Sequence, residues 1–559
     1  MLHEMSTGMP AFPGNTSAVI FEAILNRPPA ALDRLHSDLA RILGKALEKD
    51  RALRYQSAAD LRADLIRLQR DSESGRTQAA PPKAASSAPR GRKGLESLAV
   101  LPLVNASGNE DAEYLSEGIA ESLINSLSQL GRLRVAQPQK AFRYRGADVD
   151  LQRAARELGV QGILTGRLLL RGDTLVVKVN LVDIEKDAQV WGQQFTKTMA
   201  DIFILQDEIA EQVLQALKLR LSSEPKRHAR KQTPSTEVYH LYLKGRHYSA
   251  KRTAPNTTKA LEFFQQAIDL DPTYAAAYAG IADCYAHLGF TPYGSMKPAD
   301  AYPRAKTAAQ KALSLDPSLG DAYASLGMCE FFFDWDWIAS ERAFQRCLEL
   351  TPESLGARVW YPMLLASIGR WEDAIREAQR AAQIDPLSVN AAAALAQVLY
   401  LTRRFDEAST ALTRALELDP RYPTAVVFVG FVHLARHNFA EGIAVLEQTT
   451  KEIHHPHFLA HNGLAYGLAG RREDALRVLD ELTGLAAHSY VSPISFAFVY
   501  QGLGDRERWR AMMQAAFEER NGFLALLNAP WNDSVRDDPF FAELRRKVGL
   551  PERRDHNPL

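Results

Sequence analysis

The chain has 559 residues, of which 46% are hydrophobic and 24% are charged, as is typical of soluble globular proteins. Its 67 basic and 67 acidic residues balance, so composition supplies no long-range field toward nucleic acid or anionic lipid, and we expect no nucleic-acid partner. This length exceeds the ~150 residues of a usual domain and predicts three or four units.

Cysteine usage and hydropathy indicate the cellular setting. Cys284, Cys329 and Cys347 are widely spaced and form no zinc pattern, which favours a reducing compartment. The first residues lack the basic and apolar regions of a signal peptide. The most apolar run, Ala391–Leu401, is too short for the ~20 residues that span a bilayer. We therefore expect a cytoplasmic protein without a membrane segment.

The first 94 residues contain two kinds of sequence. Residues 1–70 are predicted to be helical, because Ser17–Leu25, Ser37–Leu47 and Ala58–Leu68 carry apolar residues at helical spacing. Residues 71–94 are rich in Ala, Pro, Ser and Gly and contain no large apolar residue. Nothing there can offset the entropy of ordering, so we expect a disordered linker.

Residues 95–223 are predicted to form a small α/β domain. Ser97–Leu103 has the apolar run of a buried strand, and Asp201–Leu221 reads as a long amphipathic helix. Gly172 lies between two strand-like runs and can supply the positive φ that a hairpin turn needs. The other expected elements are helices Tyr114–Leu130 and Leu151–Leu158 and strands Leu133–Ala136, Gly162–Leu170, Thr174–Ile184 and Gln189–Thr196.

Residues 236–530 repeat. Five prolines are spaced by 45, 35, 34 and 34 positions, and four of them follow an aspartate: Pro272, Pro317, Pro352, Pro386 and Pro420. A period of 34 with a proline after the second helix is the spacing of tetratricopeptide (TPR) repeats. The predicted fold is therefore a multidomain, mostly α-helical chain whose second half is an α-solenoid of helix pairs. Residues 531–559 are expected to cap its exposed end.

Residue size supports the repeat. TPR helix pairs need small residues where two helices touch and large residues that fill the gaps. Counting from each proline as position 32, the packing positions are Tyr278, Ala282, Tyr285, Gly327, Phe344, Ala374, Ala396, Ala408 and Ala415.

Helical solenoids use the concave surface formed by their first helices to hold peptides or partner proteins. Polar residues on first helices that packing does not require are candidate contacts, although each is also explained by simple solvation. They are Asp283, His287, Arg358 and Gln397. The extra residues of the 45-residue interval predict a loop around 290–298. We expect a protein partner, whose identity the sequence leaves open.

The first 70 residues resemble the end of the large lobe of a bacterial Ser/Thr protein kinase. The matching stretches are Leu2–Gly8, Pro10–Gly14, Lys45–Asp50 and Arg54–Ala58. The chain has no Gly-rich loop with a strand lysine and no HRD, DFG or APE segment, so phosphoryl transfer lacks its machinery. We interpret the region as a kinase remnant and predict no catalytic residue and no cofactor. The alternative is a kinase whose catalytic lobe is lost or encoded upstream.

Residues 97–221 resemble the TolB N-terminal-like domain of bacterial signalling proteins. The resemblance rests on Ala99–Leu103, Tyr114–Gly118, Glu157–Val160, Gly166 and Trp191. It implies a role in protein contact. The order of the three regions resembles a receptor-like kinase architecture. A fragment of a transcriptional or cyclase regulator is a weaker reading, because the first 70 residues match kinase helices and not a winged helix.

Three local patterns are given structural interpretations. A histidine cluster suggests a metal site, but without nearby cysteines we expect solvated surface residues: His454, His455, His457 and His461. Gly159–Gly166 lacks the GK[ST] ending of a P-loop and is expected to be a turn entering a strand. The aromatic residues Phe331–Phe333, Trp335 and Trp337 are expected in the core. We predict no metal site.

Overall fold

A computed structural model describes residues 10–12, 37–48, 95–108, 112–128, 133–217, 235–290 and 295–551. The chain divides into two compact units, residues 1–92 and 93–559. In the first, α3 (Ser37–Ala46) confirms one predicted helix and buries Ile42 and Leu43. The helices predicted at 17–25 and 58–68, the linker at 71–94 and most of the 290–298 loop lie outside the described residues.

The second unit begins with a mixed β-sheet of order β3-β1-β4-β5-β6, in which β2 also pairs with β4. β1 runs parallel to β3 and β4, whereas β4–β5 and β5–β6 are antiparallel. Gly172, with φ of +57°, makes the predicted β4–β5 hairpin turn. The strands are β1 (Ser97–Val100), β2 (Val104–Asn105), β3 (Arg134–Val135), β4 (Gly162–Arg171), β5 (Thr174–Asp183) and β6 (Ala188–Thr198).

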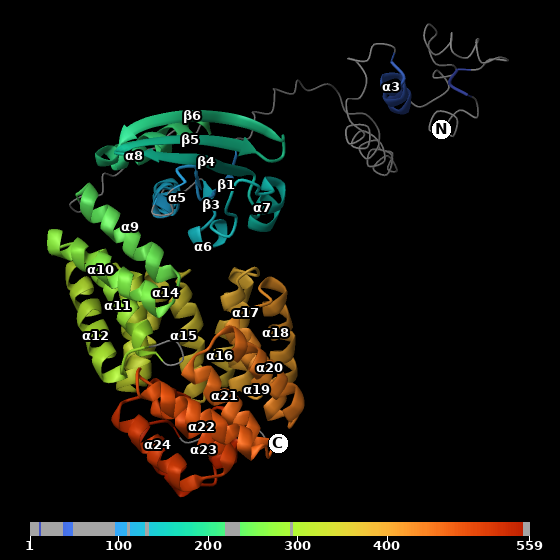
Figure 1. Cartoon of the computed structure of the whole chain (residues 1–559). Helices are drawn as coiled ribbons and strands as arrows, with labels where there is room; N and C mark the ends of the chain where they lie inside the picture. Colours follow the sequence, from blue (N-terminus) through green and yellow to red (C-terminus); the bar gives the residue numbers. More distant parts are fainter. Residues whose placement is uncertain are drawn as a thin grey trace, which may run out of the picture. The chain divides into compact units, whose positions relative to one another are not determined.

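Helices lie against both faces of the sheet around β1 (Figure 1). Successive β1 side chains point to opposite faces, so Leu98 and Val100 pack with α5 and α8, and Ala99 and Leu101 with α6 and α7. The three helices predicted at 114–130, 151–158 and 201–221 are present as α5, α7 and α8 over the described residues. The helical elements are α5 (Glu113–Ser128), α6 (Pro138–Ala141), α7 (Leu151–Leu158), η4 (Met199–Asp201) and α8 (Ile202–Ala216).

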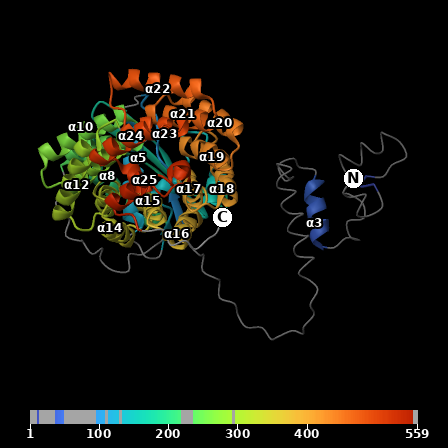
Figure 2. The ribbon, with the colours of Figure 1, turned by 90° about the horizontal axis from the view of Figure 1, so that it is seen from below.

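Residues 236–518 form antiparallel helix pairs that make up a solenoid (Figure 1 and Figure 2). Together with the sheet domain before it, this makes the chain a multidomain, mostly helical protein with a solenoid in its second half. The pairs are α9 (Thr236–Ala250) with α10 (Ala254–Leu270), α11 (Ala275–Gly289) with α12 (Pro298–Leu315), α13 (Gly320–Cys329) and its π-helical end η5 (Glu330–Asp334) with α14 (Trp337–Leu350), α15 (Leu355–Ser367) with α16 (Trp371–Ile384), α17 (Val389–Leu401) with α18 (Phe405–Leu418), α19 (Pro423–Ala435) with α20 (Phe439–Glu452), α21 (Pro456–Leu468) with α22 (Arg472–Ala486), and α23 (Pro493–Leu503) with α24 (Arg506–Glu518).

The Asp-Pro steps end the second helices. Proline cannot continue a helix, and an aspartate before it can accept a hydrogen bond from the backbone two residues on. The Asp271 carboxylate accepts the amide of Thr273 at 2.9 Å, and Asp316 and Asp419 do the same for Ser318 and Arg421. This shared turn explains why the dipeptide recurs with the repeat.

The predicted packing residues lie between helices. Gly327 is a clear case, because a Cβ there would lie 2.7 Å from the ring of the fully buried Phe344. Tyr278 and Tyr285 are half-buried at the edges of the core. The alanines are buried: Ala282, Ala374, Ala396, Ala408 and Ala415. Close helix contact thus depends on small side chains, as the pattern predicts.

After α24 the chain continues as a C-terminal segment, residues 520–550. It contains the two 3₁₀ turns η6 (Gly522–Leu526) and η7 (Pro530–Val535) and the helix α25 (Pro539–Val548). Many of its apolar side chains are buried, including Leu524, Val535, Phe541 and Leu544. In the described part of the chain, no helix has the length and apolarity needed to cross a membrane.

Candidate protein-binding surfaces

The first helices of the repeats form one continuous surface, here called the first-helix face. It comprises α11, α13 with η5, α15, α17, α19, α21 and α23. The sequence predicts a partner on this face and a cap over the last repeat. The C-terminal segment packs on the last repeat, where Phe540 meets Trp509 and Asp538 pairs with Arg510. It also reaches far back along the face, since it contacts residues from α23 to η5.

An aromatic side chain anchors the middle of the segment. The Trp531 ring stacks on Tyr400 of α17 at 5.8 Å between centroids, and it also lies 5.3 Å from Phe431 and 6.3 Å from Phe428 of α19. Aromatic pairs of this kind add about 0.5–1.5 kcal/mol to the free energy gained by burial. The segment therefore packs like a core element at this point.

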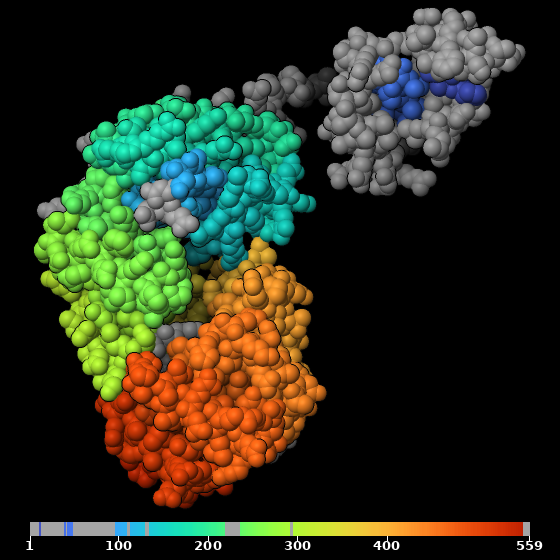
Figure 3. Space-filling model, viewed as in Figure 1, coloured from blue at the N-terminus to red at the C-terminus, as the bar shows by residue number. Residues whose placement is uncertain are grey.

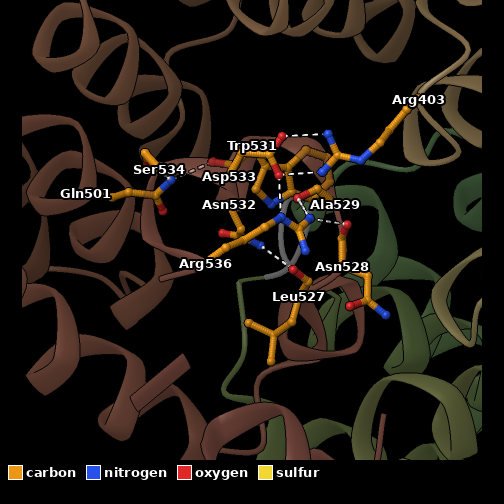
Figure 4. A network of polar contacts seen from close by, with 10 residues as sticks. All are labelled: Arg403, Gln501, Leu527, Asn528, Ala529, Trp531, Asn532, Asp533, Ser534 and Arg536. Atoms are coloured by element: carbon orange, nitrogen blue, oxygen red, sulfur yellow. Dashed lines mark hydrogen bonds and ion pairs between the residues drawn. The ribbon is translucent and has the colours of Figure 1, made fainter. Parts of the chain in front are cut away.

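Polar contacts hold the same turn (Figure 4). The Asp533 carboxylate pairs with the Arg403 guanidinium at 2.7 and 2.5 Å. Burial alone raises the pKa of Asp533, but Arg403 and Arg536 lower it below its usual range. The Gln501 amide donates to the Trp531 carbonyl at 2.5 Å, and Asn528 donates to the Ser367 carbonyl at 2.9 Å. These contacts bind η7 and the residue Asn528 before it to α15, to the turn after α17 and to α23.

The segment reaches the third helix pair at its two ends. Gly522 lies against Phe332, and Arg520 donates to the Phe333 carbonyl at 3.1 Å. The Trp337 indole donates to the Gly549 carbonyl at 2.8 Å. Phe331, Phe332 and Trp335 are buried and Phe333 and Trp337 are half-buried, so the predicted aromatic core is confirmed for three of its five members. Phe517 of α24 stacks on Trp335.

The α/β domain covers the first helix of the first pair. Leu243 of α9 fits against Gly118 of α5, where any side chain would overlap it. Arg246 pairs with Glu121 of α5 at 2.6 Å. Leu243 belongs to the apolar core of the α/β domain, so this contact joins the two folds.

A cleft of about 580 Å³ remains open between α6–α7 and the edge of the repeats (Figure 3). We call it the junction cleft. Lys140 donates to the Ile384 carbonyl at 2.6 Å, and Arg143 pairs with Asp385, so these contacts form one wall. The lining includes Lys140, Arg143, Tyr144 and Glu157 on one side and Glu353, Leu355, Arg358, Asp385, Ser388, Val389 and Glu417 on the other.

The structure places the four predicted contact residues differently. Asp283 is paired with Arg252 at 2.8 Å and lies beside His287; burial raises its pKa, but these two neighbours hold it below its usual range. Gln397 is only 8% exposed. Arg358 lines the junction cleft, although its side chain is only 10% exposed.

Arg358 is weakly paired for a buried cation. Its guanidinium donates to the Pro352 carbonyl at 2.9 and 2.7 Å, and the nearest carboxylate, that of Glu377, lies 3.9 Å away. Burial, followed by the charge of Arg380, lowers the pKa of Arg358. An anion bound in the cleft would offset the free-energy cost of burying the charge of Arg358. The sequence predicted Arg358 as a contact but not the cleft, because α6–α7 are distant in the chain.

The histidine cluster corrects the sequence interpretation in part. His454 is exposed and pairs with Glu481 at 2.7 Å, as expected for a surface residue. His457 and His461 are each 2% exposed, so the expectation of solvated side chains is wrong for them. They lie one helical turn apart on α21 and point into the core, a placement that sequence spacing alone does not reveal.

The family model described as "Tetratricopeptide repeat" matches residues 365–425. This range runs from the end of α15 to the start of α19. The match agrees with the 34-residue period and the paired helices. The chain is a multidomain protein that contains TPR repeats.

Two curated proteins are similar over part of their length. "Putative adenylate cyclase 3" of Rhizobium meliloti (strain 1021) is 28% identical over 203 residues, which are 36% of this chain and 35% of that protein. "Transcriptional regulator HilA" of Salmonella paratyphi A (strain ATCC 9150 / SARB42) is 23% identical over 299 residues, 53% of this chain and 52% of that protein. The chain thus spans between a third and about half of these relatives.

Solved structures give partial matches. A tetratricopeptide repeat protein from Parabacteroides merdae ATCC 43184 is 13% identical, with a TM-score of 0.36 over 48% of this chain and 100% of that one. YrrB, titled "a TPR protein with an unusual peptide-binding site", is 21% identical with a TM-score of 0.24 over 35% and 92%. TolB from Acinetobacter baumannii is 17% identical with a TM-score of 0.18 over 22% and 30%. These scores are too low to assign the α/β domain to a family.

Proposed function

We propose that this chain is a non-catalytic adaptor of bacterial signalling, located in the cytoplasm, that binds an extended acidic segment of a partner protein in the junction cleft. The observation that carries the proposal is Arg358, a buried and weakly paired cation on the wall of an open cleft. The TPR repeats supply the general expectation of a protein partner.

Charge and shape favour an extended segment. Lys140 and Arg143 are engaged with the end of α16, and Arg153, which also lines the cleft, pairs with Glu157 at 2.8 Å. Among the described arginines of the lining, Arg358 is therefore the one whose nearest carboxylate is as far as 3.9 Å away. Leu355 and Val389 offer apolar surface beside it, and Ser388 and Tyr144 carry hydroxyls. A chain with an acidic side chain flanked by apolar residues matches this lining.

The first-helix face is a poorer site in the state described. From α17 to α23 its aromatic residues contact the C-terminal segment, and α5 covers α9. The uncovered candidate Asp283 is neutralised by Arg252. A partner on this face would therefore have to displace part of the chain itself.

The two curated relatives support a regulatory role. One is named as a cyclase and the other as a transcriptional regulator, yet each is similar to this chain over part of its length. Because each match leaves about half or more of the relative outside it, an interaction role of the matched part is compatible with both names. In this reading residues 95–223 act as a TolB-like contact module and residues 1–70 as a kinase remnant, as their motifs suggest.

Affinity capture tests the adaptor function. Full-length protein is used as bait in the native lysate, and recovered proteins are cross-linked and identified by mass spectrometry. We expect one partner cross-linked at the junction cleft, with recovery reduced at least tenfold by Arg358→Glu. The matched control is Arg346→Glu, since Arg346 is half-exposed on α14 and pairs only with Glu349 among the recorded salt bridges of the described residues.

Recovery that is equal for both variants would sink the cleft as the binding site. Failure to recover any specific protein would count against the adaptor function itself. Thermal melting of both variants checks that the fold is intact. If Arg358→Glu unfolds the protein, Arg358→Gln replaces it as the test variant.

The alternative is the C-terminal part of a Ser/Thr kinase. It is favoured by the kinase-like stretches Lys45–Asp50 and Arg54–Ala58. Mass spectrometry of the native protein, with a search for peptides encoded upstream, distinguishes the two. Upstream peptides with HRD and DFG segments would establish the kinase; a native chain that begins at Met1 would remove it.

A further inference from the structure

Of the two buried histidines, His457 lies directly beneath the C-terminal segment and His461 packs against His457. The rings of His457 and His461 are 4.3 Å apart between centroids. Phe523 of η6 packs on His457 at 4.8 Å. Removal of η6 would therefore uncover His457, the ring on which His461 packs.

The rings lack polar partners. Among the described residues, no hydrogen-bond partner is found for His457 Nδ1 or for either ring nitrogen of His461. Buried polar atoms are nearly always paired in native proteins, so three unpaired nitrogens in one place point to a role other than stability. A neutral imidazole tolerates this site, whereas an imidazolium loses its hydration and gains nothing.

Among the described residues, no carboxylate acts on either ring of the pair. His461 meets Phe431 of α19 at 4.7 Å and Phe498 of α23 at 5.5 Å. From α20, the Thr450 hydroxyl accepts a hydrogen bond from the amide of Asn462, the residue after His461. Within the described residues, the ionisable groups that act on either ring are histidines: His455 acts on both, and His461 on His457.

We propose that His457 and His461 form a proton-sensitive latch, which keeps the C-terminal segment on the first-helix face at neutral pH and releases it on acidification. Release takes η6 and η7 off α17, α19 and α21, and it uncovers the aromatic surface on which Trp531 packs. The face is then open in acid and occupied at neutral pH.

The electrostatics agree in sign. Burial lowers the pKa of His461 to about 3, and burial with the neighbouring histidines holds the pKa of His457 well below its usual range. The released state binds more protons than the closed state, so attachment is complete above about pH 6.5 and weakens as the pH falls below it. Each ring shifts the equilibrium by up to about tenfold per pH unit.

Hydrogen–deuterium exchange of the full chain tests the latch. Peptides covering residues 520–536 are followed at pH 7.5, 6.0 and 5.0, with labelling times scaled for the intrinsic pH dependence of exchange. We expect their protection to fall at least tenfold between pH 7.5 and 5.0, while strands β4 and β5 remain protected. Equal protection of the segment at both pH values would overturn the proposal.

Variants separate the latch from general acid unfolding. In His457→Leu/His461→Leu the segment should stay protected at pH 5.0, and each single variant should retain about half of the effect on a logarithmic scale. His454→Gln is the control, because that side chain is 59% exposed on the same stretch. A pH dependence that survives in the double variant refutes the assignment. If the double variant does not fold, the single variant His461→Leu still tests the latch. So does the wild-type protein, in which the loss of protection in residues 520–536 is compared with that in strands β4 and β5.

Discussion

The first-helix face and the junction cleft are both surfaces of the repeat array, but they are occupied in different ways. The face carries aromatic residues, and the chain covers it with its own C-terminal segment. The cleft is lined by ion pairs and polar groups together with apolar residues such as Leu355 and Val389, and it stays open. Apolar surface is costly to leave in water, whereas charged walls are stable when wet.

This difference teaches where a repeat protein can bind. TPR repeats point to the first-helix face as the binding surface, but here the C-terminal segment covers that face from α17 to α23. The cleft exists only because a second domain lies beside the repeats. We therefore expect substitutions on the face to change stability and substitutions in the cleft to change binding.

The largest effect is expected at Trp531. Trp531→Ala should lower the free energy of unfolding by about 3 kcal/mol, because the ring loses its packing on Tyr400 and Phe431. Denaturant unfolding followed by circular dichroism measures the change. Ile338→Ala is the control, since that side chain is 70% exposed and should lose less than about 0.5 kcal/mol. A similar loss in both variants would show that the segment is not a core element.

A smaller effect is expected where α21 and α23 touch. A Cβ on Gly467 would overlap the backbone of Gly502, so the helices must move apart. Gly467→Ala should lower the free energy of unfolding by about 1–3 kcal/mol. Gly484→Ala, in the neighbouring α22 with open space around it, should instead raise it by about 0.5–1 kcal/mol. Thermal melting of the two variants gives opposite signs if this packing is correct.

The ion pair at the edge of the face should matter less. Asp533→Asn removes the charge that Arg403 and Arg536 contact, but Asp533 is 43% exposed, and solvent screens the loss to below about 1 kcal/mol. A double-mutant cycle with Arg403→Gln isolates the Arg403 contribution. A coupling well above this limit would mean that the pair, and not Trp531, holds the segment.

The smallest effect on stability is expected in the cleft. Arg143→Ala breaks the pair with Asp385, which is partly solvated, and should cost about 0.5 kcal/mol or less. Chemical denaturation measures it against Arg346→Ala, a half-exposed pair elsewhere on the array. A loss of several kcal/mol would make the cleft wall part of the core and remove the contrast with the face.

Much of the solenoid could be predicted because its contacts are close in sequence. Gly327 and Phe344 belong to one helix pair, so a 34-residue period and residue size are enough to place them. The same reasoning placed the hairpin at Gly172. His457 and His461 were misjudged because spacing shows that they share a helix side but not whether another segment covers it.

Taken alone, the amino-acid order determined the paired helices, the alternation of the sheet and the absence of any motif for phosphoryl transfer. These properties depend on neighbours a few positions apart. Only the tertiary structure decided which surface is filled and which is open. Arg403 and Asp533 meet although they are 130 positions apart, and Arg143 meets Asp385 across 242. No local pattern encodes such contacts, because they depend on how the helix pairs accumulate their small rotations until distant segments touch.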